Sequence, residues 1–64
     1  MNKKAANKIA QAIKKLDEAI WLCDDESDGI AIRDRRWELN DFLGENDFDV
    51  YEDSRGYHVK KVSK

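Results

Sequence analysis

The chain has 64 residues, a formal net charge of −2 and 41% charged side chains, with one cysteine and no proline. A chain of this length forms one domain with a thin core, because only about 60% of the unfolded surface is buried on folding. A single cysteine excludes an internal disulfide and no Cys/His spacing fits structural zinc, so helix packing, aided or not by self-association, must supply the stability.

The charges form three blocks along the chain. Residues 1–16 contain five lysines and no acid, all fourteen acids lie between Asp17 and Asp53, and the segment from Ser54 onward holds four basic residues and no acid. Such blocks describe surfaces and partners and not the fold. The start of the chain is amphipathic rather than wholly apolar, so we expect no signal peptide, no membrane span and a cytoplasmic location.

The first predicted element is a helix at about residues 3–24. Asn2 can cap its amino end by accepting a backbone N–H. The apolar residues recur in steps of three and four, which defines one helix face: Ala6, Ile9, Ile13, Leu16, Ile20 and Cys23. On this face, Cys23 is predicted to be a small buried apolar residue and not a reactive thiol.

The charges of this helix oppose its dipole, since lysines gather at its positive amino end and acids toward its negative carboxyl end. Two arrangements would offset that cost. A second helix can pack antiparallel so that its arginines meet Asp17, Glu18 and Asp24, or two copies of the first helix can pack antiparallel as a homodimer. The first is favoured, because a helix pair joined by a short loop is the commoner solution.

A second helix is predicted at about residues 28–43, after a polar run at 24–29. Ser27 or Asp28 would cap its amino end, and Gly44 would end it in a left-handed conformation. Its core face is predicted to contain Ala31, Ile32, Leu39, Phe42 and Leu43. Ile30 and Trp37 share the other side, so this helix has a second apolar patch.

The last twenty residues change to period two, which predicts a β-hairpin at about residues 47–62. Matching the apolar faces sets the register, in which the opposed pairs are Val50 and Val59, Asp49 and Lys60, and Tyr51 and His58. The connection is then the four residues 53–56, with Gly56 supplying a positive φ.

Because a two-stranded hairpin alone is marginal in water, its apolar face should lie on the helices. That face contains Phe48, Val50, Tyr57 and Val59. Trp21 and Leu22, which lie off the main stripe of the first helix, are the predicted contacts for it. The sequence therefore predicts an α+β fold: a small single domain of residues 1–64, with two antiparallel helices followed by a C-terminal β-hairpin.

The run between the helices is similar to one named motif. Asp24, Glu26, Asp28 and Gly29 resemble the opening of a calcium-binding EF-hand loop, which implies a calcium ion between the helices. The twelfth loop position is Arg35, where that family has a bidentate glutamate. An acidic helix connection is therefore favoured, and neither a metal nor another cofactor is predicted.

Catalytic residue types are scarce. The one cysteine lies on a core stripe and the one histidine lies in the hairpin, so they cannot form a dyad in one polar cleft. The chain has no glycine-rich phosphate loop either. We predict that the protein is not an enzyme.

The preferred function is a small non-catalytic regulator or inhibitor, of the kind that phage and mobile-element genomes often encode. Its acidic surface would bind a basic groove on a partner protein, such as a nucleic-acid-binding protein, because rows of carboxylates can stand in for phosphates. The predicted surface contains Asp17, Asp24, Asp25, Glu26, Asp28, Glu38 and Asp41. Trp37 and Tyr51 are the candidate anchors.

The alternative is a small nucleic-acid-binding regulator that uses the second helix for recognition and the hairpin as a wing. Its contacts would be Arg33, Arg35, Arg36, Lys60 and Lys61. The acids on the same helix oppose this alternative, because they repel phosphates. A third explanation stays open, in which the acidic cluster only keeps the domain soluble.

Overall fold

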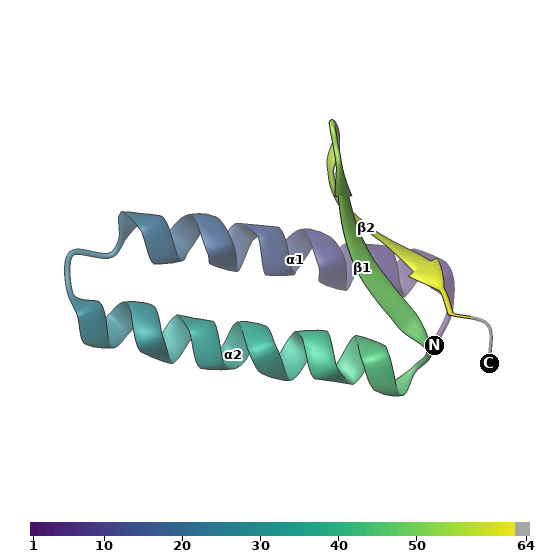
Figure 1. Ribbon diagram of the computed structural model, residues 1–64, viewed down its shortest axis with the longest axis horizontal. Coiled ribbons are helices and arrows are strands. Elements are labelled where there is room, and N and C mark those ends of the chain that lie inside the picture. The colour runs from purple at the N-terminus through teal and green to yellow at the C-terminus, as the bar shows by residue number, and fades with distance from the viewer. Residues whose placement is uncertain (63–64) are drawn as a thin grey trace.

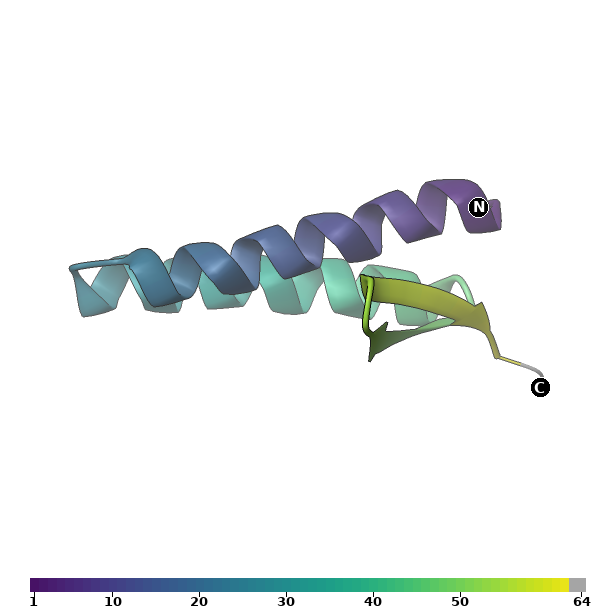
Figure 2. The ribbon, with the colours of Figure 1, turned by 90° about the horizontal axis from the view of Figure 1, so that it is seen from above.

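The computed structural model describes residues 1–62 as two helices followed by a two-stranded antiparallel sheet (Figure 1). The elements are α1, Lys3–Leu22; α2, Glu26–Glu45; β1, Phe48–Asp53; and β2, Gly56–Lys61. The helices run side by side in opposite directions, and the hairpin lies on one face at one end of the pair (Figure 2). The predicted α+β fold class is confirmed.

Helix α1 begins where the sequence predicts it. Asn2 is its N-cap, and the side-chain Oδ1 accepts the backbone N–H of Ala5 at 2.8 Å. The helix ends at Leu22, two residues before the predicted end. The cause is local: Cys23 has an extended backbone (φ −71°, ψ 130°) and donates its N–H to the Ile20 carbonyl.

Helix α2 begins two residues earlier than predicted, because its N-cap is Asp25 and not Ser27 or Asp28. The Asp25 carboxylate accepts the Ser27 hydroxyl at 2.8 Å and the Ser27 backbone N–H at 2.9 Å, and these bonds lower the pKa of Asp25. The connection is therefore only residues 23–25. Residues 26–35, which would form most of an EF-hand loop, are helical, so the predicted resemblance does not extend to the structure.

The predicted glycine cap at the end of α2 is wrong. Gly44 lies inside the helix, which continues to Glu45, and the left-handed residue is Asp47 with φ 64°. Asn46 closes the helix, and its side-chain amide donates to the Phe42 carbonyl at 2.9 Å. Aspartate tolerates the left-handed region better than most residues, so this turn needs no glycine.

The hairpin has the predicted register, with Val50 opposite Val59. The other two predicted pairs, Asp49–Lys60 and Tyr51–His58, are also confirmed. Pairing continues to Asp53 and Gly56, so the connection is the two residues 54–55 and not the predicted four. Gly56 has the predicted positive φ, at 118°. The Arg55 backbone N–H donates to the Asp53 carboxylate at 2.8 Å, which is the main reason that the pKa of Asp53 is lowered.

The core lies where the hairpin covers the helices. Its fully buried residues are Ala6, Ala10, Ile13, Leu43, Phe48 and Val59, against which Ile9, Leu39, Val50 and Tyr57 pack. The predicted apolar face of the hairpin is therefore confirmed. On α2 the predicted core face is too wide: Ala31 and Phe42 are exposed, because α1 and the hairpin together cover a narrower strip of this helix.

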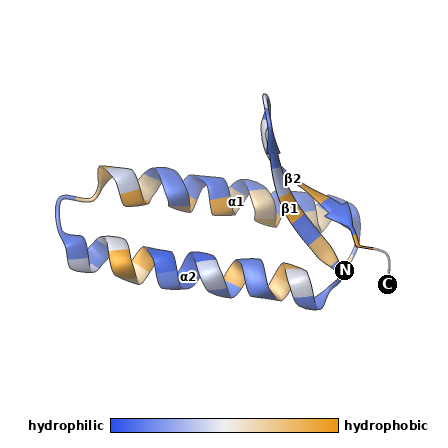
Figure 3. Cartoon of the chain, in the orientation of Figure 1, coloured by the Kyte–Doolittle hydropathy of each residue, from blue (hydrophilic) through white to orange (hydrophobic). Residues whose placement is uncertain are grey.

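Trp21 and Leu22 do not lie under the hairpin, contrary to the prediction. They are 88% and 81% exposed. The short connection after α2 starts β1 beside the amino end of α1, so the hairpin covers that end and the last turn of α1 lies at the opposite one (Figure 1). Figure 3 shows apolar residues of both helices continuing toward their connection, beyond the hairpin.

Two glycines are expected to respond in opposite ways to alanine. Gly56→Ala places a side chain at φ 118° with its Cβ 3.4 Å from Lys14 Cδ, so we expect a stability loss of about 1 kcal/mol. Gly44 is helical with nothing within 4 Å of an added Cβ, so Gly44→Ala should stabilise by about 0.5–1 kcal/mol. Urea unfolding of both variants measures the difference, and equal losses would contradict the assigned conformations.

Candidate protein-binding surface

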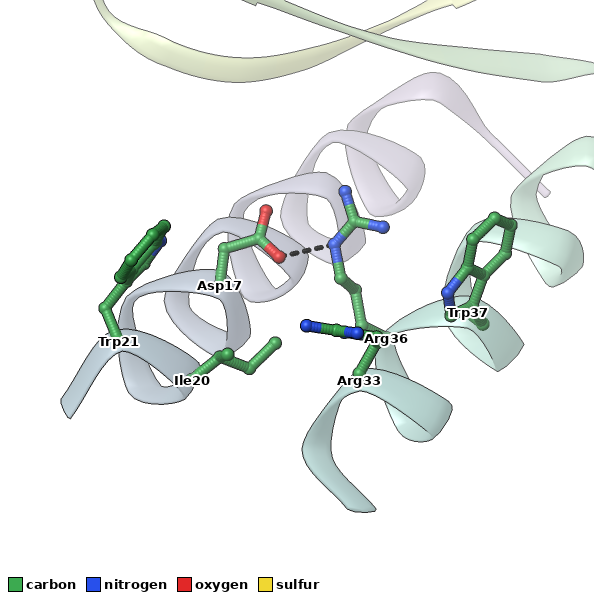
Figure 4. A pocket seen from close by; sticks show the side chains of 6 residues that line it. All are labelled: Asp17, Ile20, Trp21, Arg33, Arg36 and Trp37. Atoms are coloured by element: carbon green, nitrogen blue, oxygen red, sulfur yellow. Dashed lines mark ion pairs between the residues drawn. The ribbon is translucent and has the colours of Figure 1, made fainter. Parts of the chain in front are cut away.

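An open cleft of about 300 Å³ lies between α1 and α2 beyond the edge of the hairpin (Figure 4). Its lining residues are Asp17, Ile20 and Trp21 from α1 and Arg33, Arg36 and Trp37 from α2. Both sets have the spacing i, i+3, i+4, which places each of them on one face of its helix. Figure 4 shows the two indoles on opposite walls with the arginines between them.

The two indoles are the largest apolar groups that residues 1–62 leave exposed. Trp21 is 88% exposed and Trp37 is 54% exposed. Ile30, which is also exposed, continues the apolar surface and lines a second hollow of about 270 Å³ with Ile20 and Cys23. Exposed apolar surface of this kind marks interaction sites in small soluble proteins, and tryptophan is the side chain best suited to anchor one.

Asp17 connects the cleft to the hairpin. Its carboxylate pairs with the Arg36 guanidinium and accepts the Tyr57 hydroxyl at 2.7 Å, so one side chain joins α1, α2 and β2. The bond to the Asp17 carboxylate raises the pKa of Tyr57, because only the protonated phenol can donate it. The predicted antiparallel pairing of a second-helix arginine with Asp17 is therefore confirmed, whereas Glu18 and Asp24 make no such pair within residues 1–62.

The Tyr57 hydroxyl provides a test of this network. Its raised pKa means that the bond to Asp17 stabilises the fold below about pH 10 and is lost as the pH rises through the folded-state pKa. In a Tyr51→Phe background, the ultraviolet absorbance of tyrosinate reports Tyr57 alone. We expect Asp17→Asn to lower the pKa of Tyr57. An unchanged titration would show that the two side chains are not bonded in solution.

The other predicted acids are exposed but do not form one zone. They are Asp24, Asp25 and Glu26 at the helix connection, and Asp28, Glu38 and Asp41 along α2. Glu26 and Asp41 are about 22 Å apart along the helix, at about 1.5 Å per residue. Glu38 also accepts a bond from Arg35 at 3.2 Å. Negative charge is nevertheless concentrated toward the helix connection, since residues 17–38 contain eight acids and three arginines.

The two predicted anchors lie apart. Trp37 forms a wall of the cleft, whereas Tyr51 is on the hairpin with its ring 5.7 Å from the His58 ring. Trp21, the other wall, is predicted from its sequence position to contact the hairpin and does not. The lengths of the elements indicate that this prediction is wrong. Two 20-residue helices extend about 30 Å, and a hairpin of two strands about 4.8 Å apart is too narrow to cover their whole length.

Of the five basic residues of the nucleic-acid alternative, the structure brings Arg33 and Arg36 together in the cleft and not the others. The chain's own groups engage three of them, in the pairs Arg36–Asp17, Arg35–Glu38 and Lys61–Phe48, the last a cation–π contact. Lys60 lies opposite Asp49 in the sheet. Arg33, in the cleft, makes no ion pair with any described residue.

Within residues 1–62, no group of three or more His, Cys, Asp or Glu side chains is placed to hold a metal ion, and no helix is both long and apolar enough to cross a membrane. No protein-family model matches the chain, and no curated protein or solved structure is detectably similar to it. The class of this protein is therefore described by its structure alone: it is a helix–helix–hairpin domain with two exposed tryptophans beside a cleft.

Proposed function

We propose that the protein is a small non-catalytic regulator or inhibitor that binds a partner protein through the cleft between Trp21 and Trp37. The observation that carries this proposal is the exposure of both indoles on facing helix walls. A few buried aromatic side chains supply most of the affinity at protein interfaces, and tryptophan is the most enriched among them. Covering these two side chains would remove the largest exposed apolar groups of the described chain from water.

The acids near the helix connection, and not the lining of the cleft itself, indicate the partner's surface. Residues 17–38 contain eight acids and three arginines, and two of the arginines, Arg35 and Arg36, are already paired within the chain. Charge of this kind steers association and excludes wrong partners, while the apolar centre supplies affinity. The fitting partner has an apolar projection surrounded by basic side chains, beside the basic groove of a nucleic-acid-binding protein.

The first experiment identifies the partner by position. A photo-reactive phenylalanine analogue is placed in the full chain at position 21, and in a matched control at position 22, which is equally exposed but does not line the cleft. We expect one protein to be cross-linked from position 21 and not from position 22, with a yield that falls as salt is raised. The same product from both positions would contradict a docking surface at the cleft.

The second experiment measures affinity for that partner. Trp37→Ala should weaken binding at least about tenfold, because loss of an anchor tryptophan costs about 2 kcal/mol or more. Leu22→Ala removes an exposed apolar side chain outside the cleft and should change binding less than about twofold. Equal losses in the two variants would overturn the proposal.

One observation favours the nucleic-acid alternative as a second candidate. Arg33 lies without an ion pair from the described chain between two indoles on which bases could stack. Binding to random single-stranded and duplex oligonucleotides at low and moderate salt tests it. Salt-dependent binding that is lost in Arg33→Ala would favour nucleic acid over a protein partner.

A further inference from the structure

The two edges of the sheet are not equivalent. On β2, the Val59 backbone N–H points out of the sheet and donates to the Asn7 side chain of α1 at 2.9 Å. Val50 is directly opposite Val59, and in an antiparallel pair of this type both residues direct their backbone groups away from each other. The backbone groups of Val50 therefore point out of the free edge of β1, and the alternation gives Phe48 and Glu52 the same orientation.

No other strand of the described chain pairs with this edge of β1. Within residues 1–62, no hydrogen bond from outside the hairpin reaches the backbone N–H or carbonyl of Phe48, Val50 or Glu52. An unpaired strand edge is a template for another strand unless the protein covers it. The contact with Asn7 covers part of the β2 edge, and the β1 edge has no such cover.

The free edge borders a hollow. Val50, Tyr51, Glu52 and Tyr57 form its hairpin wall and Arg36 and Asn40 of α2 form the other, with a volume of about 240 Å³. Arg36 also lines the tryptophan cleft, so the two hollows are neighbours. β2 packs mainly on α1 while β1 faces α2, which leaves this space on the α2 side of the hairpin.

We propose that β1 accepts a third strand from the partner protein, and that this strand is an extended segment in which basic and apolar residues alternate. This inference rests on the proposed function and names its binding mode. A strand about 4.8 Å from β1 would pair with the outward backbone groups of Val50 and Glu52. Its inward side chains would enter the hollow, whose limited volume favours a small side chain such as valine against Val50 and the tyrosine rings.

The charges of β1 indicate which kind of strand pairs with its free edge. Asp49 and Asp53 alternate with Tyr51 on the outer face of the hairpin, whereas Glu52 lies on the opposite face and pairs with Lys14 of α1 at 3.3 Å. If a second copy paired its β1 antiparallel about Tyr51, Asp49 would stand opposite Asp53, and like charges at opposed positions are destabilising. Lysine or arginine at the outward positions of a partner strand would instead meet carboxylates. The occupant is therefore a basic segment and not a second copy.

The test uses two synthetic octapeptides as probes, one alternating lysine with valine and one alternating glutamate with valine. Two chemically assembled full chains carry a single backbone N-methyl group, at Val50 or at Lys61. The first removes an outward N–H of β1 and keeps every side chain. The second makes the same change on the outer edge of β2, since Lys61 is opposite Phe48, and is the matched control.

The lysine–valine peptide should bind the wild-type chain and slow hydrogen exchange of the Val50 and Glu52 amides at least tenfold. N-methylation at Val50 should weaken its binding at least tenfold, N-methylation at Lys61 less than twofold, and the glutamate–valine peptide should bind at least tenfold more weakly. Equal losses from the two N-methyl groups, or unprotected Val50 and Glu52 amides, would overturn strand addition. Protection that rises with protein concentration without peptide would assign the edge to a second copy and overturn it too.

The two proposals fail separately. Partner binding that requires Trp37 but tolerates N-methylation at Val50 would remove strand addition and leave the proposed function. Peptide pairing at β1, combined with a partner that binds equally well to Trp37→Ala, would instead keep the strand edge and remove the cleft as the docking surface.

Discussion

Leu43→Ala is expected to leave the protein largely unfolded at room temperature. Leu43 is fully buried in the last turns of α2, within a core of only six fully buried apolar residues in the described chain. Replacing a buried leucine by alanine costs about 2–5 kcal/mol, because the transfer energy is lost and a cavity remains. A single core in a chain of this length rarely supplies more than about 3–5 kcal/mol. Far-ultraviolet circular dichroism and urea unfolding measure the loss.

Leu22→Ala is the matched control for this prediction. It makes the same chemical change at a side chain that is 81% exposed, so its effect should be within about 0.5 kcal/mol. A Leu43→Ala variant with the wild-type urea midpoint would show that the last turn of α2 does not pack as the structure has it.

Asp17→Ala is expected to destabilise the fold by about 2–3 kcal/mol. The substitution leaves the Arg36 guanidinium without its ion pair and the Tyr57 hydroxyl without its acceptor, at the junction of three elements. The Asp17 and Arg36 side chains are 24% and 29% exposed, so water lowers the cost below the value for a fully buried pair. Urea unfolding is the measurement. Asp34→Ala, at an exposed position of α2, should cost less than about 0.5 kcal/mol.

A double-mutant cycle separates the network from the simple loss of a side chain. If the Tyr57 hydroxyl acts through Asp17, the losses from Asp17→Ala and Tyr57→Phe will not add, and we expect a coupling of at least about 0.5 kcal/mol. Strict additivity would mean that the two groups stabilise the fold independently.

The local predictions that are wrong concern the two ends of α2, where neighbouring residues can each form the cap or the turn. Asp25 caps α2 in place of Ser27, because its carboxylate can accept both the backbone N–H and the hydroxyl of Ser27. Gly44 continues the helix and Asp47 takes the left-handed turn three residues later. Such choices differ by a few tenths of a kcal/mol to about 1 kcal/mol, which is less than a sequence rule resolves.

By itself the sequence determined the kind and order of the elements, the cap at Asn2 and the hairpin register. These depend on spacing along the chain, since a slip of one residue would turn Val50 and Val59 away from the core. Only the tertiary structure decided where the hairpin lies along the helix pair. That position sets the exposure of Trp21, the pairing of Asp17 and the free edge of β1, because each depends on contacts between residues distant in the chain.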